Sequence, residues 1–92
     1  MDAKYFNENI LPFLQEVQAR VCKVQDFPCT CGVTARMRDD DCFRVELYIY
    51  PILRNNSRAF IYNSEMTPED MQTTNRQVLD YINNATGGRI QW

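Results

Sequence analysis

Four cysteines give this chain its most obvious capacity for metal or redox chemistry. Their spacing is C-x6-C-x-C-x10-C, at Cys22, Cys29, Cys31 and Cys42. A zinc ribbon would instead use two C-x2-C pairs. The pattern therefore favours reduced, partly buried thiols, as is usual for cysteines inside a cell. Two alternatives stay open, because spacing alone does not fix geometry: a zinc-stabilised structural module that uses all four thiols, and a disulfide between Cys22 and Cys29.

Histidine is absent from the chain, and this removes the commonest routes to catalysis. There is no imidazole base, no Cys–His pair and no Ser-His-Asp triad. The glycines Gly32, Gly87 and Gly88 form no phosphate-binding loop ahead of a helix. The run Asp39-Asp40-Asp41 lacks the spaced ligands and distal Glu of a calcium loop and is typical of a solvated turn. We therefore expect no enzymatic activity, no cofactor and no small-molecule substrate.

Arginine and tyrosine residues in the middle of the chain are the remaining candidates for function. The basic residues are eight Arg and two Lys, and Arg is the better residue for bidentate contacts and for stacking on aromatic rings. Arg and Tyr also dominate interface hot spots and suit contacts to nucleic acid bases. The candidate partner-binding residues are Arg36, Arg44, Tyr48, Tyr50, Arg54 and Arg58. The alternative is a plain solvent-facing sheet surface, which both residue types also suit.

Two strands with alternating apolar residues position most of these candidates. A three-residue turn, Asp39-Asp40-Asp41, would pair Met37 with Phe43. The same register pairs Ala35 with Val45, Val33 with Leu47, and Cys31 with Ile49. A slip of one residue would turn one apolar set to the opposite face, so the pattern predicts this pairing. It also places Arg36 opposite Arg44, which is unfavourable unless an acidic group lies nearby.

A third, shorter strand is predicted at residues 58–62, after a polar turn at 54–57. Its register stays open because apolar residues occupy both alternating sets. The core-facing pair is either Phe60 and Tyr62 or Ala59 and Ile61.

Two amphipathic helices flank the strands. The first runs from about Asp2, its predicted N-cap, to Lys23, and its apolar face comprises Phe6, Ile10, Leu14, Val17 and Val21. Pro12 predicts either a kink or a short helix abutting a longer one. The second helix begins at Thr67-Pro68-Glu69-Asp70, which offers a threonine cap, a proline in the first turn and acids at the positive end of the helix dipole. Its core stripe is Met71, Val78 and Ile82, and it ends near Gly87-Gly88.

These elements predict a single α+β domain over residues 1–92, in the order α-β-β-β-α. Ninety-two residues are too few to bury a second core. A three-stranded antiparallel sheet needs one face covered. We expect both helices to pack on the aliphatic face, which leaves the face with Arg and Tyr open.

Composition places the chain among ordinary globular proteins, with 45% hydrophobic and 24% charged residues. A net charge of −2 gives no overall attraction to nucleic acid. No apolar run is long enough to span a bilayer. The N-terminus has acids and amides where a secretory signal would carry basic and apolar residues. We therefore expect a cytoplasmic protein that has no membrane contact.

Two resemblances bear on function. The order α-β-β-β-α resembles the double-stranded-RNA-binding domain, but that family carries a lysine cluster where this chain has Pro68-Glu69-Asp70, which counts against binding to duplex RNA. In length, class and lack of catalytic residues the whole chain resembles the small phage-encoded anti-CRISPR inhibitors of type I surveillance complexes. That resemblance implies a location in the host cell cytoplasm and steric occlusion, with Cas subunits and guide RNA as partners. It carries over no functional residue.

The leading hypothesis is therefore a non-enzymatic binding protein that acts as an inhibitor. In its sharpest form this is a phage anti-CRISPR protein that docks on a CRISPR-Cas surveillance complex and blocks binding of target DNA. A single-stranded RNA- or DNA-binding module that uses the Arg/Tyr face is the alternative. The zinc-stabilised structural module is a third.

Overall fold

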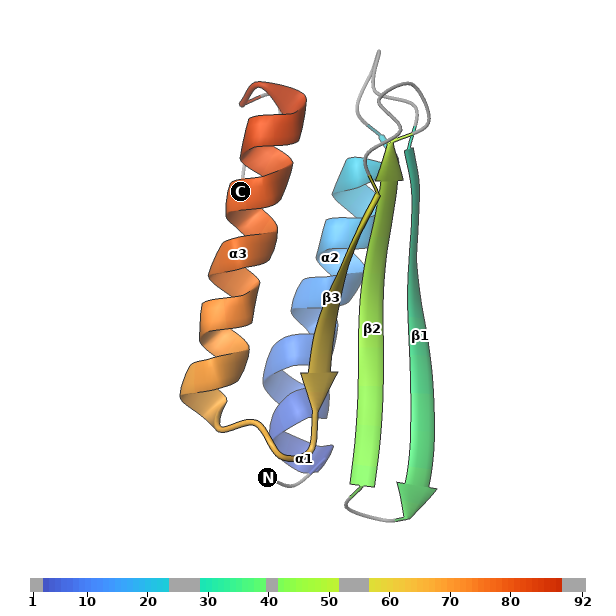
Figure 1. Cartoon of the computed structure of the whole chain (residues 1–92), viewed down its shortest axis with the longest axis vertical. Helices are drawn as coiled ribbons and strands as arrows, with labels where there is room; N and C mark the ends of the chain where they lie inside the picture. Colours follow the sequence, from blue (N-terminus) through green and yellow to red (C-terminus); the bar gives the residue numbers. More distant parts are fainter. Residues whose placement is uncertain (1–2, 24–28, 40–41, 52–56, 89–92) are drawn as a thin grey trace.

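The chain folds as a helical segment, three antiparallel strands and a final helix (Figure 1). A computed structural model describes residues 3–23, 29–39, 42–51 and 57–88, with the backbone alone at residues 29, 37–39 and 51. The elements are α1 (Ala3–Tyr5), η1 (Phe6–Ile10), α2 (Leu11–Val21), β1 (Cys29–Asp39), β2 (Cys42–Pro51), β3 (Arg58–Asn63) and α3 (Pro68–Thr86). The predicted α+β class and the order α-β-β-β-α are confirmed.

Pro12 sets the form of the first helical segment. One π-helical turn, η1, joins the short α1 to the longer α2, and the N–H of Leu11 donates to the carbonyl of Phe6. Pro12 then lies in the first turn of α2, directly after the π-helical turn, and the first turn is where a helix best tolerates proline. This matches the predicted short helix that abuts a longer one. The apolar stripe stays in phase, and all five predicted members are buried: Phe6, Ile10, Leu14, Val17 and Val21. The predicted cap Asp2 lies outside the described residues.

The hairpin of β1 and β2 has the predicted register. Met37 pairs with Phe43, and the same register holds for Ala35 with Val45, Val33 with Leu47, Cys31 with Ile49, and Arg36 with Arg44. The turn differs from the prediction. Asp39 belongs to β1 and pairs with Cys42 after an irregularity between Met37 and Asp39, while residues 40–41 lie outside the described part.

The structure settles the register of β3. Leu47 pairs with Phe60 and Val45 with Tyr62. Phe60 and Tyr62 are therefore buried, whereas Ile61 points outward and is exposed. The sheet order is β1-β2-β3, so β1 and β3 are its edge strands.

Helix α3 begins and ends as its sequence predicts. The Thr67 hydroxyl accepts from the N–H of Asp70 at 3.1 Å, and the Asp70 carboxylate accepts from the N–H of Thr67 at 3.2 Å. Gly87 ends the helix with φ 64°, a left-handed conformation that glycine adopts at no steric cost. Met71, Val78 and Ile82 are buried as predicted, and Asn75 is buried among them.

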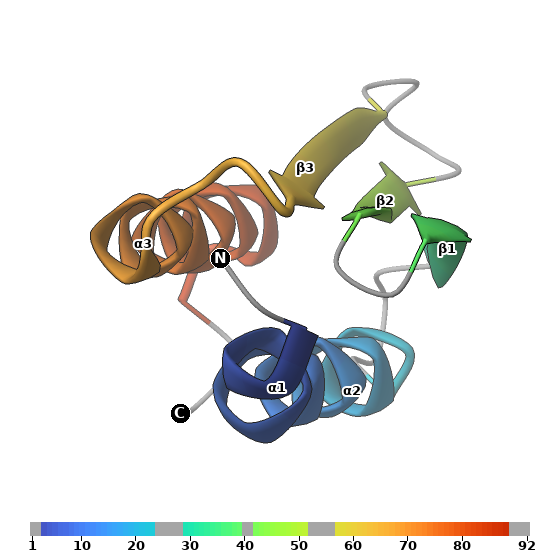
Figure 2. The same cartoon turned by 90° about the horizontal axis from the view of Figure 1, so that it is seen from below.

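Both helices cover the same face of the sheet (Figure 2). The Phe6 ring lies 5.1 Å from the Phe43 ring and 6.0 Å from the Tyr62 ring. At the other side of the same face, the Phe60 ring lies 5.8 Å from the Tyr81 ring of α3. None of the described helices lies over the opposite face of the sheet (Figure 2). This open face carries most of the predicted binding residues.

Candidate binding face

The open face is organised as rows of residues that pair across the strands. The strand positions on the face turned away from the helices are Thr30, Gly32, Thr34 and Arg36 of β1, Arg44, Glu46, Tyr48 and Tyr50 of β2, and Ala59, Ile61 and Asn63 of β3. One end of the face has the row Arg36–Arg44–Asn63. The row Gly32–Tyr48–Ala59 lies four residue pairs further along, past the row Thr34–Glu46–Ile61, with Tyr50 beyond it. The face therefore has a cationic end and an aromatic end.

At the cationic end, two arginines lie directly opposite each other. Arg36 pairs with Arg44 in the register, and both are exposed. Arg44 Nη2 lies 4.0 Å from Glu46 Oε2, at the limit of an ion pair, and these side chains are 53% and 36% exposed. Within the described part of the chain, Arg36 makes no ion pair. Like charges placed opposite each other destabilise a sheet, so this end of the face favours an anionic group from outside.

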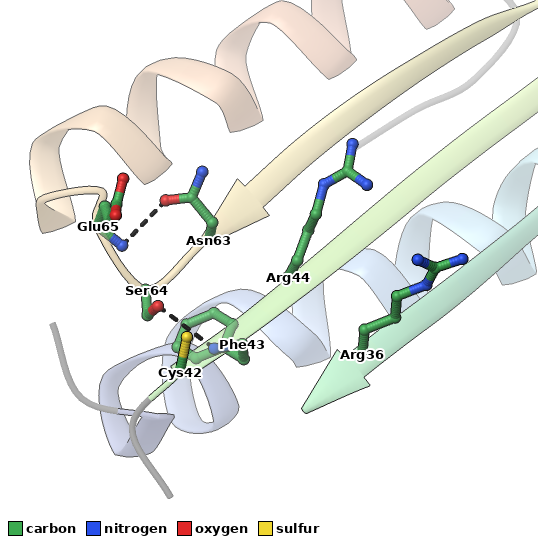
Figure 3. A pocket seen from close by; sticks show the side chains of 7 residues that line it. All are labelled: Arg36, Cys42, Phe43, Arg44, Asn63, Ser64 and Glu65. Carbon is green, nitrogen blue, oxygen red and sulfur yellow. Dashed lines mark hydrogen bonds between the residues drawn. The ribbon is translucent and has the colours of Figure 1, made fainter. Parts of the chain in front are cut away.

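An open hollow of about 490 Å³ borders the two arginines. Figure 3 shows its lining residues: Arg36, Cys42, Phe43, Arg44, Asn63, Ser64 and Glu65. The turn after β3 uses its own polar groups internally. Ser64 Oγ accepts from the N–H of Phe43 at 3.3 Å, and Asn63 Oδ1 accepts from the N–H of Glu65 at 2.9 Å. The guanidinium groups are the positively charged donors that border the hollow, and their geometry matches that of an incoming carboxylate or phosphate.

At the aromatic end, the Tyr48 ring lies across Gly32 of the neighbouring strand. A Cβ atom built on Gly32 would come within 2.3 Å of Tyr48 Oη and 2.5 Å of Cζ. Only glycine permits this approach, and the ring in turn covers the glycine backbone, which is buried. Beside Tyr48, two large side chains stand exposed: Tyr50 at 40% and Ile61 at 39%. Rings held in place and exposed beside an aliphatic side chain are typical of protein-binding surfaces.

Four of the six predicted binding residues come together on this face, namely Arg36, Arg44, Tyr48 and Tyr50. The placement of Arg58 there is wrong. Arg58 pairs with the buried Ile49, and its guanidinium lies on the helix side, 4.8 Å from the centre of the Phe60 ring and 6.0 Å from that of Tyr81. The sequence left the register of β3 undecided, so it did not predict that the Arg58 side chain lies on the helix side. Arg54 lies outside the described residues.

Two members of the face were missed in the sequence. Ile61 shares its strand with two buried aromatics, and no local signal told which set faced outward. Gly32 was identifiable, because the predicted hairpin register already put the smallest residue opposite the large Tyr48.

The cysteines do not gather in the part of the chain that the structure describes. Cys31 is buried on the core side, as predicted, while Cys22 and Cys42 are exposed, and none of these three forms a disulfide. Among the described residues, no three Cys, Asp or Glu side chains form a group that could hold a metal ion. The side chain of Cys29, the fourth predicted ligand, is outside the described part.

The fold and the face together define a small α+β protein with one helix-covered and one open sheet face. Comparison of the chain with protein-family models, with curated proteins and with solved structures found no match. None of the described helices has the length and hydropathy needed to cross a membrane.

Proposed function

We propose that this chain is a small non-enzymatic inhibitor that binds a macromolecular partner through its open sheet face. The observation that supports this most directly is the Arg36–Arg44 pair. These two exposed cations lie opposite each other, and among the described residues their one ionic contact is that of Arg44 with Glu46 at 4.0 Å. Such a pair gains most from an anionic partner group. Exposed Tyr50 and Ile61 on the same face add apolar area that a partner would cover.

A protein surface suits this face better than a nucleic acid backbone. The chain has a net charge of −2, and two acidic side chains, Glu46 and Glu65, border the arginines. Binding to phosphates rests on many cations acting together. Two arginines beside tyrosine and isoleucine match instead the composition of a protein-interface hot spot.

The specific form of the proposal is a phage anti-CRISPR protein. It docks on a type I CRISPR-Cas surveillance complex and sterically blocks the binding of target DNA. The support for this form is the resemblance in length, fold class and missing catalytic histidine. An acidic group on a Cas subunit would meet Arg36 and Arg44, and the body of the domain would obstruct the path of the DNA.

The test measures binding of target duplex DNA by a purified type I surveillance complex with its guide RNA, with and without the protein. The wild-type chain should abolish DNA binding in proportion to its own binding to the complex. The double variant Arg36→Glu/Arg44→Glu should inhibit DNA binding at least tenfold more weakly. It replaces both cations with anions, which an acidic group of the partner repels. The matched control is the double variant Lys4→Glu/Arg76→Glu, the same total charge change at exposed positions of α1 and α3.

Each result has a defined reading. Full inhibition by Arg36→Glu/Arg44→Glu would exclude the open face as the binding site. Equal loss in the Lys4→Glu/Arg76→Glu control would mean that net charge, not the face, decides binding. No binding of the wild-type chain to the complexes tested would overturn the anti-CRISPR form for those complexes.

A single-stranded nucleic acid is the second candidate partner, favoured by one observation. Tyr48 and Tyr50 stand on the same face of β2, where bases could stack on them beside the two arginines. Titration with a labelled single-stranded RNA and DNA at low and high salt tests it. Affinity that falls steeply with added salt would support this candidate, and no binding at low salt would remove it.

A further inference from the structure

The outer side of β1 is an edge of the sheet. β1 is the end strand of the sheet order β1-β2-β3, and among the described residues no strand pairs with its outer side (Figure 1). It lies on the side of the molecule away from α3 (Figure 2). Every second residue of an edge strand directs its N–H and C=O away from the sheet, and these groups form a template for another strand.

The regular part of this edge has two clear limits. At its start, Gln18 of α2 donates through Nε2 to the carbonyl of Cys31 at 3.1 Å. At its end, the ladder becomes irregular between Met37 and Asp39. The stretch between these limits is Gly32–Arg36, and Thr34 is its midpoint.

The side chains of this stretch are poorly covered on both faces. Thr34, Ala35 and Arg36 are all exposed in succession, although Ala35 shares the core side with the buried Cys31. Val33, also on that side, is only half-buried. The helices therefore leave the core side of β1 incompletely covered, and a further strand at this edge would complete it.

In one antiparallel register, a second copy of β1 would pair with this edge and also cover the exposed core side of the strand. If a two-fold axis perpendicular to the sheet passes through Thr34, residue numbers of paired positions sum to 68. Val33 then lies opposite Ala35 of the second copy, so that the two apolar side chains cover each other. Arg36 lies opposite Gly32 of the second copy, and no like charges face each other.

This register also gives Arg36 an aromatic neighbour. Gly32 is the residue over which the Tyr48 ring lies. An Arg36 side chain placed opposite Gly32 would reach the Tyr48 ring of the second copy, and guanidinium groups stack favourably on aromatic faces. Like the inter-strand pairing, this contact occurs twice about the axis, as a two-fold interface requires.

We propose that the chain forms a symmetric dimer through antiparallel pairing of β1 with β1 of a second copy, centred on Thr34. The two sheets then become one continuous sheet, and the two open faces lie side by side on the same surface. This goes beyond the proposed inhibitor function, which needs only the open face of one copy.

Disulfide trapping tests the register directly. In a background with Cys22, Cys29 and Cys42 replaced by Ser, Thr34→Cys should form a disulfide-linked dimer rapidly under mild oxidation. Paired residues on an antiparallel axis have Cα atoms about 4.5–5.5 Å apart, within the range of a disulfide. Thr30→Cys is the matched control, an exposed threonine of the same strand and face. Its two copies would be roughly 27 Å apart along the strands, and it should cross-link at least tenfold more slowly.

Light scattering over a range of concentrations tests the dimer without oxidation. The wild-type chain should approach twice its 10.9 kDa mass, and Thr34→Lys should remain at the single-chain mass because it places two cations on the axis. A wild-type chain that stays monomeric at all concentrations, or equal cross-linking at both cysteine positions, would overturn the proposal. Failure here is separate from failure of the inhibitor function, because these measurements contain no partner.

Discussion

A buried hydrogen bond between β3 and α3 provides the sharpest test of the packing described above. Tyr62 is fully buried, and its hydroxyl donates to Asn75 Oδ1 at 2.6 Å. Asn75 is itself 7% exposed, and its Nδ2 donates to Gln72 Oε1 at 3.5 Å, the limit of a hydrogen bond. The Tyr62 hydroxyl is therefore the main partner that satisfies the buried amide oxygen of Asn75.

The substitution Tyr62→Phe removes that hydroxyl and leaves Asn75 Oδ1 buried without its donor. The expected loss in the free energy of unfolding is about 1–3 kcal/mol, the cost of an unsatisfied buried polar group. Asn75→Leu should cost a similar amount, because it leaves the Tyr62 hydroxyl unpaired. The double variant should be more stable than the sum of the two losses predicts, since both polar groups are then gone.

Urea denaturation followed by circular dichroism measures these changes. Domains of this size have total stabilities of about 5–15 kcal/mol, so the loss should move the urea midpoint clearly while the slope stays constant. If Tyr62→Phe unfolds at the wild-type urea concentration, the bond does not stabilise the fold. If the losses of the two single variants simply add in the double variant, the two residues do not act as a pair.

Three further predictions use the same unfolding measurement. Burial raises the pKa of Tyr62, so the folded state keeps a proton that the unfolded chain loses above about pH 10. Stability should therefore fall as the pH rises beyond 10, and less so in Tyr62→Phe; equal falls would contradict this. Gly32→Ala should raise the free energy of unfolding of a Tyr48→Ala chain by about 0.5–1 kcal/mol. In the wild type, where the Tyr48 ring occupies that space, the same substitution should raise it less or not at all. Equal changes in the two backgrounds would refute the contact. Thr67→Ala should cost about 1 kcal/mol by removing the cap of α3, and an unchanged midpoint would exclude that role.

The hairpin register was predictable because its two apolar sets are unambiguous. A slip by an odd number of residues would turn one apolar set to the other face, and the short connection between the strands selects among the remaining pairings; the structure has the predicted one. The start of α3 was predictable for a similar reason: Thr67 and Asp70 act locally, through bonds to each other's backbone. Features that are determined by residues close in the sequence can be predicted without knowledge of the tertiary fold.

The features that the sequence did not predict correctly are those that depend on tertiary packing. Strand β3 is apolar on both alternating sets, and packing against α3 and against Phe6 of η1 selects Phe60 and Tyr62 for the core. The orientation of Arg58 follows from that selection, which is why its predicted place on the open face was wrong. Asn75 interrupts an otherwise apolar stripe, and its burial depends on a hydroxyl 13 residues away in the sequence.

The two proposals make different demands on the two opposed arginines, and this difference allows them to be separated. In the proposed dimer, Arg36 stacks on Tyr48 of the second copy, whereas Arg44 belongs to the central strand β2 and has no role at the β1 edge. Arg44→Glu should therefore weaken inhibition of the surveillance complex and leave the mass of the dimer unchanged, while Arg36→Glu should weaken both. A dimer that is lost in Arg44→Glu but kept in Arg36→Glu would show that the β1 edge is not the interface, because only Arg36 lies on that strand.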